Sequence, residues 1–143
     1  MKSEKLKLQI TADIKKEGPI YDLPILIAIL KSTGQLSCDT DSSAFLGELS
    51  LNGEVRRING VLPMALLAAQ RGARELYVPA ANAAEAAAAG IPVYGVQNVA
   101  QLLAHLQGTR QIPCQRAVAV TSHGRRKNNT RFRIRFQILQ PTR

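Results

Sequence analysis

The chain has few aromatic residues and few cysteines. Among its 143 residues there are three Phe, three Tyr and no Trp, so leucine, isoleucine, valine and alanine must supply most of the core. The two cysteines, Cys38 and Cys114, lack the close spacing of a zinc site. Isolated thiols are typical of a reducing, cytoplasmic setting, and a disulfide between the two is the alternative.

Long apolar runs are missing as well. The longest, at residues 23–30, covers less than half of the ~20 residues that a membrane-spanning helix requires. The charged start of the chain is not followed by the apolar stretch of a signal peptide. These absences predict a protein without membrane association.

Two classes of binding site are also missing. The chain has no G-x-x-x-x-G-K-S/T motif, and therefore no P-loop for a nucleotide. Its two histidines, His105 and His123, have no neighbouring cysteines or carboxylates to complete a metal site. The sequence predicts no metal and no other cofactor, and it places His105 on the surface of an amphipathic helix.

Acidic residues are absent from the last quarter of the chain. Up to Gly108 there are ten Lys or Arg and ten Asp or Glu, so this part has a formal charge of zero. After Gly108 there are nine Lys or Arg and no acid, which accounts for the whole formal charge of +9. The sequence therefore predicts a neutral domain at residues 1–108 and a basic tail at residues 109–143.

The basic tail has two interpretations. Residues 131–138 alternate basic and apolar side chains, and a strand with arginines on one face could bind phosphates. The second interpretation, which we favour, is a disordered segment or the end of a truncated gene. The candidate nucleic-acid-binding residues are Arg125, Arg126, Lys127, Arg131, Arg133 and Arg135.

Hydrophobic periodicity predicts the elements of the first half. Residues 6–10 alternate as a half-buried strand, and residues 23–32 form a helix that is apolar on nearly all sides, with Asp22 as its N-cap. Residues 35–43 are expected to form a loop. A strand over residues 45–51, a two-residue turn at Asn52 and Gly53, and a return strand from Val55 predict a β-hairpin.

The second half predicts alternating helices and strands. A helix from Val61 should end at Gly72, and strands are expected at residues 75–79 and 91–96. Asn82 with Glu85, and Asn98 with Gln101, have the spacing of reciprocal N-terminal caps of two further helices. The alternation favours parallel pairing in a mixed sheet, and all helices and strands are expected to end before Gly108.

Six separated segments carry a resemblance: DIKKEG at residues 13–18, YDLPI at 21–25, GELSLNGEVR at 47–56, GVLP at 60–63, LLAA at 66–69 and YVPAAN at 77–82. They resemble the proteolytic domain of Lon protease. They are similar, still more closely, to the Lon-like N-terminal domain of the Mg-chelatase-related ComM/YifB proteins, which are AAA+ ATPases of DNA processing. RadA-type recombination proteins carry a similar domain and are the nearest alternative. The resemblance implies an α/β fold with a mixed sheet, as in Lon protease and the second domain of ribosomal protein S5.

The resemblance also identifies the positions of a catalytic dyad. Lon-type proteolysis needs a serine hydroxyl that is activated by a lysine amine. At the positions that match this serine and lysine, the chain has Ile20 and Ala65. Because neither side chain can act as nucleophile or base, the sequence predicts no peptidase activity and no catalytic residue.

The expected function follows from the resemblance and from these replacements. It implies a non-catalytic accessory domain of a ComM/YifB-type protein, without a recognisable ATPase module in this chain. Its expected partners are an AAA+ ATPase module or other protein subunits. Nucleic-acid binding through the basic tail is the alternative function, and a RadA-type accessory domain is another.

Overall fold

The computed structural model describes residues 18–117. The strand predicted at residues 6–10 therefore lies outside the described residues. The described part contains helices and 3-10 turns around short strands. In chain order these are η1 Pro19–Tyr21, α2 Asp22–Ser32, β1 Ser43–Phe45, β2 Glu48–Leu49, β3 Val55–Arg56, α3 Val61–Gln70, β4 Glu75–Pro79, η2 Ala80–Asn82, α4 Ala83–Ala86, η3 Ala87–Ala89, β5 Val93–Val96, α5 Val99–Leu106 and β6 Cys114–Gln115.

Four strands form the central sheet in the order β1-β4-β5-β6. β1, β4 and β5 are parallel, and β6 pairs antiparallel with β5. β2 and β3 form a separate antiparallel hairpin. The predicted α/β fold with a mixed sheet, of the Lon-like kind, is thus confirmed.

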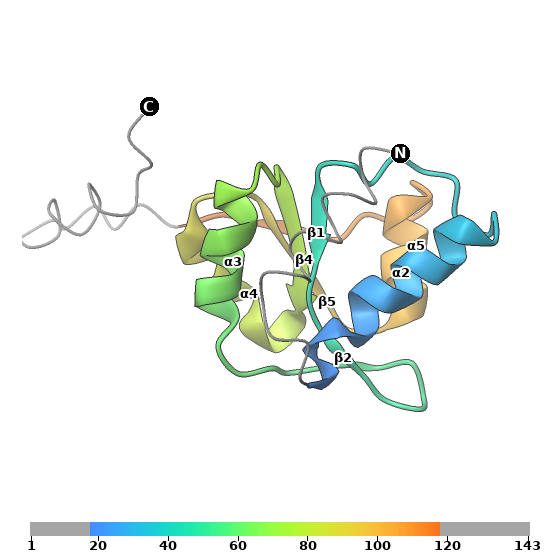
Figure 1. Ribbon diagram of the computed structural model, residues 1–143, viewed down its shortest axis with the longest axis horizontal. Helices are drawn as coiled ribbons and strands as arrows, with labels where there is room; N and C mark the ends of the chain where they lie inside the picture. Colours follow the sequence, from blue (N-terminus) through green and yellow to red (C-terminus); the bar gives the residue numbers. More distant parts are fainter. Residues whose placement is uncertain (1–17, 118–143) are drawn as a thin grey trace, which may run out of the picture.

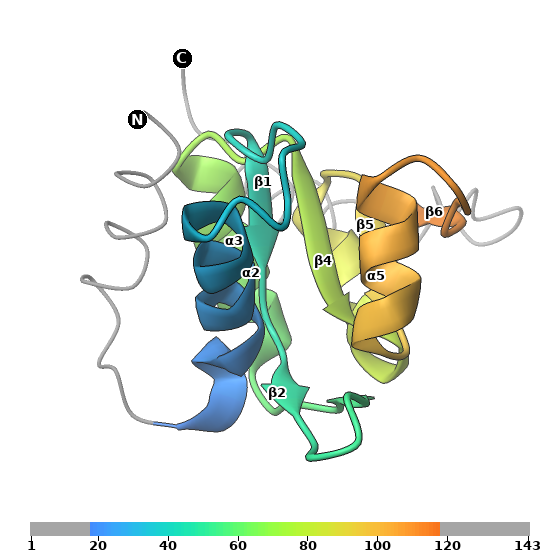
Figure 2. The same cartoon turned by 90° about the vertical axis from the view of Figure 1, so that its right-hand side faces the viewer.

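Helices cover both faces of the central sheet (Figure 1). α3 and α4 pack on one face, and α2 and α5 on the other (Figure 2). Successive side chains of a strand point to opposite faces, so the central strand β4 serves both layers. Its Leu76 and Val78 lie in the cluster with α3 and α4, whereas Tyr77 lies in the cluster with α2 and α5.

The strand predicted over residues 45–51 is wrong as a single element. β1 ends at Phe45, and the chain then leaves the central sheet to form the hairpin. Gly47 lies where the chain leaves the central sheet. Its N–H donates to the carbonyl of Ile20, and its own carbonyl accepts from the N–H of Leu23. A Cβ at Gly47 would stand 2.8 Å from Cγ1 of Val55, so only glycine fits without a shift of the hairpin.

The β-hairpin itself is confirmed, but its predicted two-residue turn is wrong. The N–H of Ser50 donates to the carbonyl of Glu54, and the N–H of Gly53 donates back to the carbonyl of Ser50. Three residues therefore connect this pair, with Gly53 at a φ of 81°. A turn that ends in a left-handed glycine is the usual three-residue connection of a hairpin.

The first predicted helix is confirmed as α2, but two of its details are wrong. Asp22 is its first residue rather than its N-cap, and the carboxylate accepts from the N–H of Leu49 at 3.1 Å. The helix is also not buried on all sides, because Ile25 and Ile29 are 54% and 51% exposed. Leu23 and Ile27 face the core.

Of the two predicted reciprocal caps, the one at Asn82 is wrong, and the one at Asn98 forms only in part. Asn82 makes no cap; its side chain is 1% exposed and bonds instead to the backbone of Ile58. Asn98 does cap α5 by accepting from the N–H of Gln101. Oε1 of Gln101 accepts from the N–H of Gln97, whereas the reciprocal motif requires it to accept from the N–H of Asn98.

The expectation that all elements end before Gly108 is wrong. β6 follows at Cys114–Gln115 and pairs with β5. Between them Ile112 is 5% exposed and joins the cluster that α2 and α5 form. The start of the basic tail is therefore part of the folded structure, at least as far as Gln115.

Candidate functional site

The structure brings Ile20 and Ala65, the two positions that the resemblance matches to the Lon dyad, to one apolar cluster. Ala65 lies on α3 with 0% exposure, inside the cluster that covers one face of the sheet. Ile20, in η1, is half-buried and packs against the same cluster. Both positions are therefore surrounded by aliphatic side chains.

One other pair of a lysine and a hydroxyl exists among the described residues. Lys31 is the only lysine between residues 18 and 117, and its Nζ donates to Oγ1 of Thr40 at 2.9 Å. Thr40 is 1% exposed, so its hydroxyl offers no surface to a peptide carbonyl. This contact ties the end of α2 to the loop before β1. It is structural, and no sequence pattern signalled it.

Most of the described aromatic residues form one stack across the parallel strands. The rings of Phe45 and Tyr77 are 4.8 Å apart, and those of Tyr77 and Tyr94 are 5.0 Å apart. These pairs are direct neighbours in the register of β1, β4 and β5. Offset stacking of this kind stabilises a fold beyond the area that it buries. Phe45, Tyr77 and Tyr94, three of the four Phe and Tyr residues within residues 18–117, thus lie together on one face of the sheet.

Glu75 accepts two hydrogen bonds at the edge of this stack. Its Oε1 lies 2.5 Å from Oγ of Ser43 and 3.1 Å from the hydroxyl of Tyr77. Burial, and then the negative charge of Glu75, raise the pKa of Tyr77 far above its ordinary value. Tyr77 therefore stays protonated near neutral pH and donates its hydroxyl hydrogen bond to Glu75.

His105 closes the stack, and its predicted place on the helix surface is wrong. The side chain is half-buried, and its ring lies 4.7 Å from that of Tyr94. Its Nδ1 accepts from the N–H of Ile112 at 2.8 Å. Burial lowers the pKa of His105 below its ordinary value, although the negative charge of Glu75 opposes this change. His105 therefore holds the segment that leads to β6.

This arrangement makes stability depend on pH. Since the pKa of folded His105 lies below the unfolded value of about 6.5, the unfolded chain takes up a proton more readily as the pH falls. We expect the free energy of unfolding to decrease as the pH falls through this interval, because protonated Nδ1 cannot accept from Ile112. Denaturant titrations at about pH 7.5 and about pH 5.5 measure this change.

His105→Asn is the matched control for this prediction. The asparagine Oδ1 occupies nearly the same place as Nδ1 and can accept from the N–H of Ile112, but it does not titrate. Both the parent and His105→Asn contain His123, so any contribution from His123 is the same in the two proteins. Equal pH dependence in the parent and in His105→Asn would contradict the assignment to His105.

The other residues that the sequence suggested for a binding site do not form one within residues 18–117. Arg125, Arg126, Lys127, Arg131, Arg133 and Arg135 all lie outside them. Cys38 is half-buried and Cys114 is exposed, and both are free thiols, so the disulfide alternative is not formed. Residues 18–117 contain no group of three or more metal-ligating side chains. No helix in this range is long and apolar enough to cross a membrane.

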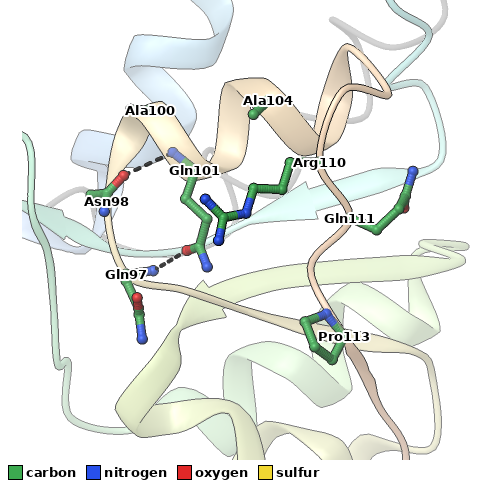
Figure 3. Close-up of a pocket in the computed structure, with 8 residues that line it drawn as sticks. All are labelled: Gln97, Asn98, Ala100, Gln101, Ala104, Arg110, Gln111 and Pro113. Atoms are coloured by element: carbon green, nitrogen blue, oxygen red, sulfur yellow. Dashed lines mark hydrogen bonds between the residues drawn. The ribbon is translucent and has the colours of Figure 1, made fainter.

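Sequence reasoning missed a pocket beside α5. It has a volume of about 560 Å³ and is lined by residues at the start of α5 and in the segment after that helix (Figure 3). Arg110, which the sequence assigned to the basic tail, projects into it toward Gln101. Only the fold of residues 109–115 back onto β5 brings these two side chains together.

Comparison with known proteins identifies the family. Residues 5–82, more than half of the chain, match the protein family described as subunit ChlI of Mg-chelatase. The chain belongs to this family. The matched range includes both Ile20 and Ala65. The resemblance derived from the separated sequence segments is thereby confirmed.

Relatives of known name agree with this assignment. The chain is 38% identical over 104 residues to competence protein ComM of Haemophilus influenzae, which covers 71% of this chain and 20% of that protein. It is 35% identical over 97 residues to DNA repair protein RadA of Bacillus subtilis, covering 67% of this chain and 21% of that protein. It is 40% identical over 75 residues to the uncharacterized protein YifB of Salmonella typhimurium, covering 52% and 15%. The chain thus spans about a fifth of the length of its first relatives.

Proposed function

We propose that this chain is a non-catalytic Lon-like domain of a ComM-type protein that acts in DNA processing in the cytoplasm. The observation that carries the proposal is the aliphatic packing of Ile20 and Ala65 at the dyad positions. A serine–lysine mechanism requires a hydroxyl and an amine in contact with each other and with substrate. Neither group is present at these positions.

A domain without its own chemistry contributes through contacts. The relatives are about five times longer than the matched segment, which leaves most of their length to other modules. We therefore propose that the domain docks on an AAA+ ATPase module and positions it. The RadA relative supports the same role in a recombination protein as the alternative.

Binding to an ATPase module tests this role. The purified chain is titrated into the separately expressed ATPase module of a ComM relative, and association is followed by calorimetry and by the ATPase rate. We expect saturable binding and no ATP hydrolysis by this chain alone. Absence of binding together with hydrolysis of ATP or peptide by this chain would contradict the proposal.

A second candidate function is nucleic-acid binding through the basic tail. The observation that favours it is that nine Lys or Arg residues follow Gly108, whereas no Asp or Glu does. Neutralisation of phosphates by such a segment gives binding that is independent of sequence and weakens steeply with salt, because counterions are released. The RadA relative of Bacillus subtilis is named a DNA repair protein, which agrees with this candidate.

Replacement of the six candidate residues by glutamine in the full chain tests this second function. We expect weak DNA binding by the parent and a shallower salt dependence for the variant, because each lost phosphate contact reduces the slope by about 0.9. The matched control replaces Arg56, Arg57, Arg71 and Arg74 in the folded domain. Salt-resistant binding, or an equal loss in the control, would show that the tail is not the binding element. The six replaced residues are Arg125, Arg126, Lys127, Arg131, Arg133 and Arg135.

A further inference from the structure

We propose that the pocket beside α5 binds a carboxylate side chain of a partner protein's acidic segment. This inference rests on the proposed role in protein contacts and names the chemistry of one such contact. Eight residues line the pocket, and none of them is acidic (Figure 3). Its volume of about 560 Å³ lies within the range of pockets that hold small-molecule ligands, which leaves room for a carboxylate side chain.

Backbone hydrogen bonds fix the orientation of two amide side chains in the pocket. Oδ1 of Asn98 accepts from the N–H of Gln101 at 2.8 Å, and Oε1 of Gln101 accepts from the N–H of Gln97 at 2.8 Å. Each amide oxygen therefore faces a backbone donor. The opposite ends, Nδ2 of Asn98 and Nε2 of Gln101, remain as donors, and no described residue accepts from them.

Arg110 adds a charged donor to the same pocket. Its side chain projects from the segment after α5 toward Gln101 (Figure 3). The backbone around it is held, because the N–H groups of Thr109 and Arg110 donate to the carbonyl of Ala104, and that of Ile112 donates to His105. Within residues 18–117 no acidic side chain pairs with the Arg110 guanidinium. Its position is thus prepared by the fold, while its charge is free for a ligand.

The Arg110 guanidinium and the Gln101 amide beside it suit one carboxylate (Figure 3). A guanidinium and an amide NH₂ group can together donate to both oxygens of a monoanion, and a guanidinium binds a carboxylate in a fixed, planar geometry. A doubly charged phosphate would keep an unbalanced charge beside the single arginine. A nucleic acid would present a row of phosphates, to which the pocket lining offers one cation. The geometry therefore favours an acidic peptide.

The test uses the isotope-labelled full chain and a blocked peptide in which glutamate alternates with alanine. Side-chain NH₂ resonances of Asn98 and Gln101, and the Nε–H of Arg110, report binding at the pocket by NMR. We expect saturable shifts of these resonances with the glutamate peptide and none with the matched glutamine peptide. Inorganic phosphate and a short DNA duplex serve as the competing ligands.

Two variants distinguish this pocket from general charge attraction. Arg110→Gln should weaken peptide binding about tenfold or more, the effect of losing one charge-assisted hydrogen bond. Gln101→Glu keeps an acceptor for the N–H of Gln97 but replaces the donor by a negative charge, and should abolish binding. Arg116→Gln, an exposed arginine outside the pocket, should leave it unchanged.

The outcomes separate this inference from the proposed function. Equal shifts with the glutamate and glutamine peptides, or equal losses in Arg110→Gln and Arg116→Gln, would overturn the pocket assignment. Tighter binding of phosphate or DNA at the same resonances would overturn the choice of a carboxylate. Either result leaves binding to the ATPase module unaffected. Loss of that binding, with the peptide still bound at the pocket, would instead overturn the proposed function.

Discussion

Ala65→Lys is expected to destabilise the folded chain by about 4 kcal/mol or more at neutral pH. Ala65 is 0% exposed within an aliphatic cluster, so the introduced amine would have to lose its charge or its hydration. Burial lowers the pKa of a lysine strongly, and holding it neutral at pH 7 alone costs about 4–5 kcal/mol. The four added side-chain atoms strain the packing further. Denaturant unfolding of the two proteins measures the difference.

The matched control for this prediction is Gln70→Lys. Gln70 lies on the same helix but is exposed, so its replacement should change the free energy of unfolding by less than about 0.5 kcal/mol. The destabilisation by Ala65→Lys should also become smaller as the pH rises toward 10, because the unfolded chain then loses its proton too. Similar stability of both variants at neutral pH would mean that position 65 retains the polar surroundings of a dyad.

Asn82→Ala is expected to destabilise the fold by about 2–6 kcal/mol. Oδ1 of Asn82 accepts from the N–H of Ile58 at 2.9 Å, and Nδ2 donates to the carbonyl of the same residue at 2.8 Å. Alanine would leave both backbone groups of Ile58 unpaired in a buried place, at about 1–3 kcal/mol each. Thermal and denaturant unfolding measure the loss.

Asn59→Ala supplies the control within the same connection. Asn59 follows Ile58 but is exposed, so its replacement should cost less than about 0.5 kcal/mol. Asn82→Asp keeps the acceptor for the N–H of Ile58 while it removes the donor and buries a charge, and should also be strongly destabilising. If Asn82→Ala unfolds with the same midpoint as Asn59→Ala, the two bonds from Asn82 to Ile58 do not stabilise the fold.

The sequence predicted the elements whose signals are local. The periodicity of α2 and α3, the end of α3 at Gly72, and the hairpin around Gly53 all depend on neighbours within a few residues. The mixed sheet followed from the alternation of strands and helices. These features are decided by turn chemistry and apolar spacing, which a single sequence displays.

The errors share a different cause, since they concern contacts between distant residues. Asn82 has the spacing of a cap, but the unpaired backbone of Ile58, 24 positions earlier, takes its side chain instead. Asp22 is likewise taken by the N–H of Leu49. His105 became half-buried because the segment at Ile112 folds back over it. A polar residue near a helix start has several potential partners, and only the tertiary fold selects among them.

The candidate site was likewise predictable only in part. The prediction that no serine–lysine dyad is present rests on Ile20 and Ala65 at the positions that the resemblance matches to it. That the two positions meet in one apolar cluster required the fold. The α5 pocket was hidden because Arg110 seemed to belong to the tail, whereas the segment through β6 returns it to the domain.

The most direct test of the central claim is peptide hydrolysis by the purified full chain. The release of fluorescence from labelled casein is followed over increasing protein concentrations, with an active Lon protease as the positive control. Lys31→Met removes the only lysine of residues 18–117 and serves as the matched variant. We predict no release above that of buffer for the parent or for this variant. A release that is proportional to protein concentration and saturates with substrate would contradict the assignment of a non-catalytic domain.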